Sequence, residues 1–352
     1  MDITSFKEIF DPLLIHHLES KQDSYEKITS NTTVLATLSH IQKVSTGGKR
    51  LRPFIVWALY ASQKKEADIK DIAPLLIAIE LFHVFCLIHD DIMDEAPVRH
   101  STPTIHTYTT NTLLHTRDTQ NLARAGESQA ILAGDILFNQ VYELLHKDTW
   151  LTSDIREEIR NVFTILVDEV CLGQMLDIDL TTKREVSIKD IEEKNRLKTA
   201  YYSFARPLHI GALIAGRKDL IDTAIQFGEC VGNVFQVQDD LLDIIGDEKN
   251  TKKEVLADIT KNQHTILTEY IRTQAPSHHK ETLDTFCGMP KENINNKDVV
   301  TLFEESGAIA YAKQYIQDHM TQAQQIITHA QLADEDTYVF NTILSLLHHR
   351  TS

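Results

Sequence analysis

A chain of 352 residues is long enough to bury a large core, and its 42% hydrophobic and 24% charged residues are an ordinary globular composition. The formal net charge of −16 argues against nucleic acid as a partner, because phosphate backbones are bound by clustered Lys and Arg. Only 12 glycines and 8 prolines are present, which favours long helices over a turn-rich β protein.

The cysteine pattern and the N-terminal segment predict the cellular compartment of the protein. Four scattered cysteines without a CxxC pair indicate reduced thiols rather than a disulfide or zinc framework. The first 25 residues carry charges throughout and lack the apolar core of a signal peptide. The most apolar stretch, residues 72–88, is interrupted by Pro74, Glu80 and His83 and is too short and polar to span a bilayer. We therefore expect a cytoplasmic protein that is not integral to a membrane.

Helical periodicity runs through almost the whole chain, and no run alternates strictly enough to predict a strand. The expected helices, in chain order, are residues 34–44, 72–86, 128–147, 154–176, 189–216, 221–235, 255–273 and 308–346. The first of them stops before Gly47 and Gly48, which are plausible helix-ending residues. Loops are expected at 96–124 and 274–296. Neither is a long flexible linker, so we expect a single domain over residues 1–352.

Two identical acidic motifs of the form DDxxD each follow directly on an apolar helical stretch. They are HDDIMD, with Asp90, Asp91 and Asp94, and QDDLLD, with Asp239, Asp240 and Asp243. Because positions i and i+4 share a helix face, each motif gathers three carboxylates within about one turn. Near a helix C-terminus these charges oppose the macrodipole, so a cation should offset them. Magnesium, which prefers one or two carboxylates with phosphate oxygens and water, fits this chemistry. One such motif is often solvated surface, but two favour a metal site.

Basic residues are interleaved with the acidic motifs. Lys49, Arg50 and Arg52 lie in GGKRLRP, at a glycine-marked break where backbone N–H groups and side chains can reach a phosphate. Alone this is a weak signal, since a helix stop beside solvated bases is common. Further bases flank the acidic motifs, namely Arg99 and His100 after the first and Lys198 and Lys253 around the second. Diphosphates bridged by metal ions need this pattern, because metals neutralise one side and cations the other.

In these motifs the sequence resembles the trans-isoprenyl diphosphate synthases, or polyprenyl synthetases, over about residues 30–350. The landmarks are GGKRLRP at 47–53, LIHDDIMD at 87–94, RHSTPT at 99–104, LAGD at 132–135, GQMLD at 173–177, KTA at 198–200, FQVQDDLLDIIGD at 235–247, and SGA followed by YA at 306–312. The resemblance implies an all-α fold, a single-domain bundle of long helices around a deep central cavity, and a homodimer.

The resemblance also assigns roles to residues. It implies that the two motifs face each other and hold three Mg²⁺ ions through Asp90, Asp91, Asp94, Asp239 and Asp243, with Asp240 close by. Isopentenyl diphosphate would be held by Lys49, Arg52 and His83, and the allylic diphosphate by Arg99, Lys198 and Lys253. Thr199 and Gln236 would lie along the reacting allyl group.

The implied reaction joins isopentenyl diphosphate head-to-tail to an allylic diphosphate. Cations help pyrophosphate to leave, the alkene attacks the allylic carbocation, and a proton is lost to the pyrophosphate. Phe82, Phe85 and Cys86 lie one to two turns before Asp90, where the resemblance places the floor of the product channel. One aromatic ring at that depth is typical of synthases that stop at twenty carbons, and Phe82 or a dimer partner could shorten the product to fifteen.

Two departures from the family pattern remove phosphate-binding charge. His100 stands where an arginine usually helps to hold isopentenyl diphosphate, followed by Ser101 in place of a glycine. Gln263 stands where a lysine is usual, and Lys261, two residues away, is a possible substitute. We expect a raised Michaelis constant rather than loss of activity.

Three other functions fit this sequence less well. A terpene cyclase would show one aspartate-rich motif and a differently composed second metal site. A head-to-head synthase of the squalene type would lack GGKRLRP. A non-catalytic subunit that binds a true synthase would have lost motif aspartates, and all six are present.

Overall fold

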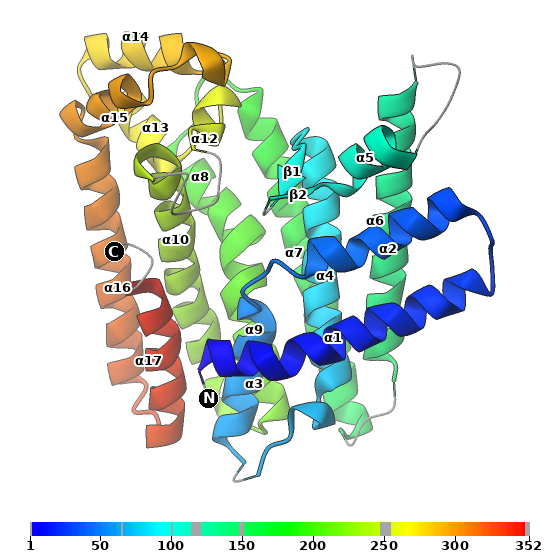
Figure 1. Ribbon diagram of the computed structural model, residues 1–352. Coiled ribbons are helices and arrows are strands. Elements are labelled where there is room, and N and C mark those ends of the chain that lie inside the picture. The colour runs from blue at the N-terminus through cyan, green and yellow to red at the C-terminus, as the bar shows by residue number, and fades with distance from the viewer. Residues whose placement is uncertain are drawn as a thin grey trace. The chain divides into compact units, whose positions relative to one another are not determined.

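The computed structural model describes residues 2–64, 66–99, 101–113, 121–147, 151–246 and 255–348 (Figure 1). Nearly all of this is helical, which confirms the predicted all-α class. The one sheet in these ranges is an antiparallel ribbon of two-residue strands, β1 (Val98–Arg99) and β2 (Thr102–Pro103). The chain forms two compact units, Met1–Ala58 with Lys64–Arg156 and Leu59–Gln63 with Glu157–Ser352. A single domain over residues 1–352 therefore stays a prediction.

The first unit is built from helices that are apolar along one side. Its elements are α1 (Ile3–Glu26), α2 (Thr32–Ser45), most of α3 (Leu51–Ser62), η1 (Ile69–Asp71), α4 (Ala73–Met93), α5 (Ile105–Tyr108), η2 (Thr109–Leu113) and α6 (Leu122–Leu145). Helix α1 was not predicted from the sequence, although Phe6, Phe10 and Leu14 recur at every fourth position and are buried. Helix α4, the most apolar of these helices, packs along α6 and carries the first acidic motif at its C-terminal end.

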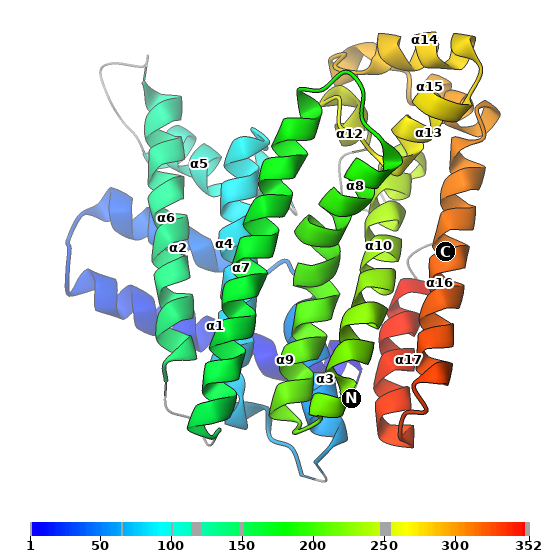
Figure 2. The ribbon, with the colours of Figure 1, turned by 180° about the vertical axis from the view of Figure 1, so that it is seen from behind.

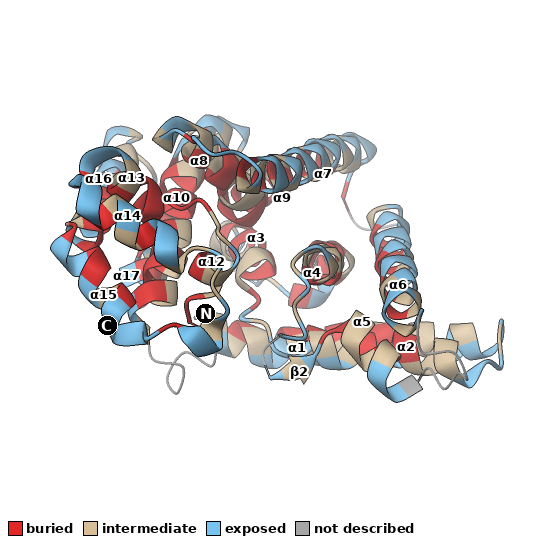
Figure 3. Cartoon of the chain, turned by 90° about the horizontal axis from the view of Figure 1, so that it is seen from above, coloured by how far each residue is buried: buried red, intermediate tan, exposed pale blue. Residues whose placement is uncertain are grey.

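The second unit surrounds the long helix α10. Its elements are α7 (Ser153–Thr181, from Glu157 on), α8 (Ile188–Asn195), η3 (Arg196–Ala205), α9 (Arg206–Ile214), η4 (Lys218–Leu220), α10 (Ile221–Ile245), α12 (Ala257–Thr260), α13 (Ile266–Gln274), α14 (Ser277–Phe286), η5 (Lys291–Asn293), α15 (Asn296–Glu305), α16 (Ala308–His329) and α17 (Asp334–His348). Helix α10 contacts η3, α9, α16 and α17, and α16 and α17 run beside it in both side views (Figure 2). Buried residues accordingly recur along α10, from Ala224 to Ile244. Such residues are drawn red in Figure 3.

Three glycines let neighbouring helices approach the backbone of η3, a π-helical segment within an otherwise α-helical run. A methyl group on Gly173 of α7 would lie 2.4 Å from the backbone nitrogen of Lys198. On α10, a methyl group on Gly232 would lie 2.3 Å from Cα of Ala200, and one on Gly228 would lie 2.4 Å from Cα of Ala205. Side chains on η3 are therefore held at close range to α7 and α10 from both flanks.

The expected boundaries are wrong in four places. The helix expected over 255–273 is broken between α12 and α13, where Asn262 has a φ of 51° and Thr265 caps α13. The loop expected over 274–296 contains α14 and η5, and the loop expected over 96–124 contains the ribbon, α5 and η2. The helix expected over 308–346 is interrupted between α16 and α17.

Candidate active site

The first acidic motif lies at the C-terminal end of α4, where the ribbon β1–β2 returns a base to it. Arg99 donates from Nε to Oδ1 of Asp91 at 2.6 Å and from Nη2 to Oδ2 of Asp90 at 3.3 Å. Asp94 ends the helix, and its backbone N–H binds the carbonyl of Asp90. The structure thus brings three predicted site residues, Asp90, Asp91 and Arg99, into direct contact.

Asp91 has the electrostatic environment expected of a cation ligand. It is 1% exposed, and burial raises its pKa to about 6 although Arg99 stabilises the charged form. Its second oxygen, Oδ2, is buried and has no hydrogen-bond partner. A buried carboxylate oxygen without a partner is unfavourable, so the motif fits a bound metal ion.

The basic segment GGKRLRP divides into outward and inward residues. Lys49 is exposed in the turn between α2 and α3, and Arg52 is half-buried at the start of α3. Arg50 turns inward, where it donates to Oδ1 of Asp11 and to Oε1 of Glu80 at 2.6 Å each. A methyl group on Gly48 would lie 2.9 Å from Nη1 of Arg50, so this position has little room for a side chain. In this segment Arg50 is therefore the base that forms the buried ion pair, and Lys49 is the exposed one.

The residues expected to limit product length form part of an aromatic cluster between α4 and α6. Phe82 is fully buried, whereas Phe85 and Cys86, like His83 on the same helix, are half-buried. The ring of Phe138 on α6 lies 5.2 Å from that of Phe85 and 6.2 Å from that of Phe82. Phe138 was missed by the sequence analysis, because only packing of the two helices shows that it meets this cluster.

The second acidic motif, at the C-terminal end of α10, is linked to two neighbouring segments. Asp243 accepts hydrogen bonds from the backbone N–H groups of Ala257 at 3.0 Å and Asp258 at 3.1 Å, and so ties down the start of α12. On the other flank, Thr199 donates to Oε1 of Gln236 at 2.7 Å, and Nε2 of Gln236 donates to Oδ1 of Asp240 at 2.8 Å. The predicted residues Thr199, Gln236 and Asp240 therefore form one hydrogen-bonded chain.

Lys198 is held by an aspartate of the GQMLD segment. Its Nζ lies 2.6 Å from Oδ2 of Asp177, whose other oxygen, Oδ1, lies 3.3 Å from Nζ of Lys194. Burial opposes ionisation of Asp177, but the charges of the two lysines outweigh it and lower its pKa. Lys194 and Asp258 were not predicted as site residues. Acidic and basic residues are scattered along the chain, and the sequence does not show which of them are in contact in the fold.

The carboxylates of the second motif are poorly compensated without a cation. Burial, reinforced by repulsion from Asp258, raises the pKa of Asp240 to about 7 and that of Asp243 to about 8. Within the described ranges, no group of three or more His, Cys, Asp or Glu side chains is arranged to hold a metal ion by itself. The motif thus has the donors of a Mg²⁺ site that is completed by phosphate oxygens and water.

These raised pKa values make the stability of the metal-free protein pH-dependent. Asp240 and Asp243 bind a proton more tightly in the folded chain than in the unfolded chain, so their contribution to stability is lost as the pH rises through 7 and 8. In a chelator, the melting temperature should fall as the pH rises from above the ordinary pKa of 3.8 to the folded values of about 7 and about 8, and should level off at higher pH. Asp240→Asn should reduce this slope, whereas Asp222→Asn, exposed at the other end of α10, should not. If the melting temperatures of the two variants had the same pH dependence, Asp240 would not be the group responsible for it.

Two of the predicted residues lie outside the described segments, and two related ones lie within them. His100 and Lys253, both predicted to bind diphosphate, are outside the described residues. Gln263 is half-buried, and its backbone N–H binds the carbonyl of Asp258 at 2.7 Å. Lys261, the possible substitute for the expected lysine, is exposed.

Comparison with known proteins decides the family. The polyprenyl synthetase family model matches residues 34–305. The chain belongs to the polyprenyl synthetase family. This polyprenyl synthetase is 30% identical, over 311 residues and 87% of both chains, to the short chain isoprenyl diphosphate synthase of Methanothermobacter thermautotrophicus. It is 32% identical to the geranylgeranyl diphosphate synthase of Methanosarcina mazei over 230 residues, 64% of this chain and 63% of the relative.

A solved structure supports the same fold. The polyprenyl synthetase resembles the crystal structure of geranylgeranyl pyrophosphate synthase from Corynebacterium glutamicum complexed with isoprenyl diphosphate and magnesium. The TM-score is 0.87 and the sequence identity 26%, with 100% of this chain and 99% of the other covered. The predicted isoprenoid synthase fold is therefore confirmed.

Proposed function

We propose that this chain is a magnesium-dependent prenyltransferase that condenses isopentenyl diphosphate head-to-tail with an allylic diphosphate. The observation that carries the proposal is the pair of DDxxD motifs, each with a buried and under-compensated carboxylate and each beside a base. In the first motif these are Asp91 and Arg99, and in the second Asp240 and Lys194, whose charge favours the ionised form of Asp240. The relatives that make short-chain prenyl diphosphates support the same substrate class.

The two units would assemble into one catalytic domain, with the motifs facing each other across a central cavity. In this arrangement Lys49, Arg52, His83 and His100 bind isopentenyl diphosphate, and Arg99, Lys198 and Lys253 bind the allylic diphosphate. Three Mg²⁺ ions, bound by the motif aspartates, would supply charge neutralisation of the departing diphosphate. The magnesium in the similar Corynebacterium structure supports the choice of metal.

The protein's own residues then stabilise the charges that develop. The allylic C–O bond breaks, and its electron pair leaves with the diphosphate, whose negative charge Arg99 and Lys198 stabilise. Thr199 donates its hydroxyl proton to Gln236, so its oxygen lone pairs remain available to the positive allyl group. The alkene electrons of isopentenyl diphosphate form the new C–C bond, and the resulting cation loses a proton to the released diphosphate. Apolar walls exclude the water that would quench the cation.

The product would have twenty carbons. Phe85 and Phe138 form a half-exposed aromatic pair ahead of the fully buried Phe82, so chain growth along α4 meets bulky rings within two turns of Asp90. A fifteen-carbon product would follow if Phe82 and Phe85 together block the channel earlier. The relative from Methanosarcina mazei, a geranylgeranyl diphosphate synthase, favours the longer of the two.

The decisive test is incubation of the purified protein with isopentenyl diphosphate and, separately, dimethylallyl, geranyl and farnesyl diphosphates. The dephosphorylated products are then chromatographed. We expect a C20 alcohol with Mg²⁺ and none after chelation of the metal. Absence of product from every starter, even at high isopentenyl diphosphate, would overturn the proposal and favour the non-catalytic subunit or a cyclase.

The protein would act as a homodimer in the cytoplasm. Leu132 and Tyr142 on α6 are 57% and 62% exposed, and Leu172 and Met175 on α7 are 55% and 66% exposed, which supplies apolar surface for self-association. Pale blue residues follow α7 along its length in Figure 3. All four cysteines are free thiols, and no helix among the described residues is long and apolar enough to cross a membrane. Light scattering should give the mass of two chains, and a monomer would refute the dimer.

A further inference from the structure

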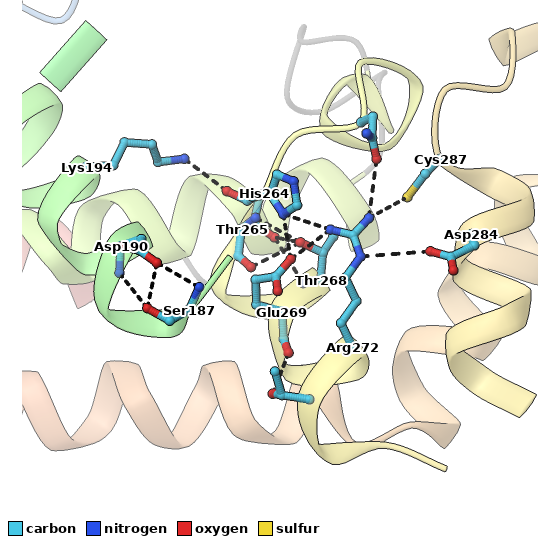
Figure 4. Close-up of polar contacts among 12 residues, drawn as sticks. Ser187, Asp190, Lys194, His264, Thr265, Thr268, Glu269, Arg272, Asp284 and Cys287 are labelled. Carbon is cyan, nitrogen blue, oxygen red and sulfur yellow. Dashed lines mark hydrogen bonds and ion pairs between the residues drawn. The ribbon is translucent and has the colours of Figure 1, made fainter. Parts of the chain in front are cut away.

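A lysine that the proposed mechanism does not use is buried beside the second acidic motif. Lys194 on α8 is 8% exposed, and its Nζ lies 3.3 Å from Oδ1 of Asp177 and 3.0 Å from the carbonyl oxygen of His264 (Figure 4). Lysine is almost never buried unless its charge is paired. Its position therefore needs an explanation beyond packing.

The surroundings of Lys194 are strongly acidic. Its charge favours the ionised forms of Asp177, Asp240 and Asp258, while these carboxylates repel one another and burial disfavours their charge. Lys194 thus places a fixed positive charge among the acids that surround the proposed metal and diphosphate site. Lys194 is buried on α8, whereas Lys261, the possible substitute for the lysine expected at Gln263, is exposed.

Asp177 is shared between two lysines. One of its oxygens contacts Lys194 and the other contacts Lys198, the predicted ligand of the allylic diphosphate. Without Lys194, the whole charge of Asp177 would be opposed by Lys198 alone. Lys198 would then be held more strongly by Asp177, and a diphosphate would have to compete with that ion pair.

The hydrogen bond from Lys194 to the His264 carbonyl joins the lysine to a buried hydrogen-bond network. The His264 carbonyl belongs to the segment that leads into α13, and the His264 ring lies 2.6 Å from Oε1 of Glu269. Arg272 donates to the same oxygen at 2.7 Å, and Thr265 caps α13 through Thr268 (Figure 4). Because this network is buried, the His264 carbonyl fixes the Lys194 ammonium in place between α7, α8 and the segment before α13.

We propose that Lys194 is a positioning residue, which neutralises Asp177 from the side opposite Lys198 and so keeps the charge of Lys198 available to the allylic diphosphate. It also supplies, from α8, positive charge beside the segment in which Gln263 replaces the expected lysine. This inference rests on the proposed function and assigns a specific role within the same site.

The test is a steady-state comparison of Lys194→Met with the wild-type protein. We expect the Michaelis constant for the allylic diphosphate to rise on the order of tenfold, with that for isopentenyl diphosphate little changed. Lys194→Arg should restore part of the affinity. Lys189→Met, which removes an exposed lysine from the same helix, is the matched control and should behave as wild type.

A double variant separates this role from a merely structural one. Lys194→Met combined with Asp177→Asn removes both members of the pair, leaves no uncompensated buried carboxylate, and should bring the allylic Michaelis constant back toward that of Asp177→Asn alone. Calorimetric titration with a non-reactive allylic thiodiphosphate, and melting temperatures, give readouts independent of turnover. Unchanged allylic affinity in a folded Lys194→Met protein, or no recovery in the double variant, would overturn the proposal. An inactive wild-type protein would instead refute the proposed function.

Discussion

Asp91→Asn is expected to lower kcat on the order of 10²–10³-fold, the range typical of losing one preorganised electrostatic group. Asp91 is 1% exposed, with one oxygen bound by Arg99 and the other without a hydrogen-bond partner. Asparagine keeps the shape but removes the negative charge that a metal ion needs. It also removes the charge of one of the two carboxylates, Asp91 and Asp90, that hold Arg99 in the orientation proposed for diphosphate binding. The measurement is kcat as a function of Mg²⁺ concentration, which should also shift to a higher half-saturating value.

The free energy of unfolding should not fall in Asp91→Asn. A loss of activity at unchanged stability would show that the variant lacks a metal ligand and is not misfolded. Burial raises the pKa of Asp91 to about 6, so above that pH the charged side chain destabilises the metal-free protein and asparagine relieves the effect. The matched control is Glu95→Gln, which neutralises an exposed carboxylate one residue beyond the motif. A wild-type kcat in Asp91→Asn, or an equal loss in Glu95→Gln, would remove the first motif from the mechanism.

The local parts of the site were predictable from the sequence, because repeated spacing and helix geometry determine them. The helical period alone predicts that each DDxxD motif, at the end of an apolar helix, gathers its carboxylates within about one turn. The structure places Asp91 and Arg99 in direct contact, and it joins Thr199, Gln236 and Asp240 in one hydrogen-bonded chain. The helical class also followed from periodicity together with the scarcity of glycine and proline.

Tertiary contacts account for most of what the sequence did not reveal. Arg50 stands between Lys49 and Arg52 in the same basic segment, yet it is buried against Glu80, and only the packing of α1, α3 and α4 decides this. Lys194 likewise looks like any lysine on a polar helix until α7 brings Asp177 to it. Charge patterns along a chain do not distinguish a buried partner from a solvated one.

Backbone conformation explains the misplaced boundaries. Residues 255–273 have helical periodicity, but Leu256 and Asn262 adopt φ values of 62° and 51°, which no α-helix accommodates. The hydrogen bonds from Ala257 and Asp258 to Asp243 hold the backbone next to Leu256, and their acceptor lies 14 and 15 residues upstream. The π-helical segment η3 likewise lies against Gly173 and Gly232, which are distant in the sequence, so local propensity does not reveal these contacts.

Phe85→Ala is expected to change the main product from C20 to longer prenyl diphosphates. The Phe85 ring lies 5.6 Å from Phe82 and 5.2 Å from Phe138, so its removal opens the side of the cluster nearest the first motif. Each further condensation adds five carbons, and the growing apolar chain gains about 0.8 kcal/mol for every CH₂ group that it buries in the opened space. Chromatography of the dephosphorylated products from farnesyl diphosphate measures the shift.

Variants on α6 identify which ring limits growth. Phe138→Ala should lengthen the product less than Phe85→Ala, because Phe138 is 37% exposed and borders the cluster, and the double variant should lengthen it most. Asn139→Ala, which truncates the exposed neighbour of Phe138 on α6, is the matched control and should leave the product at C20. If Phe85→Ala and Phe138→Ala both make only the wild-type product, the floor lies elsewhere. Lengthening only in a variant that also replaces the buried Phe82 would then assign the limit to that residue.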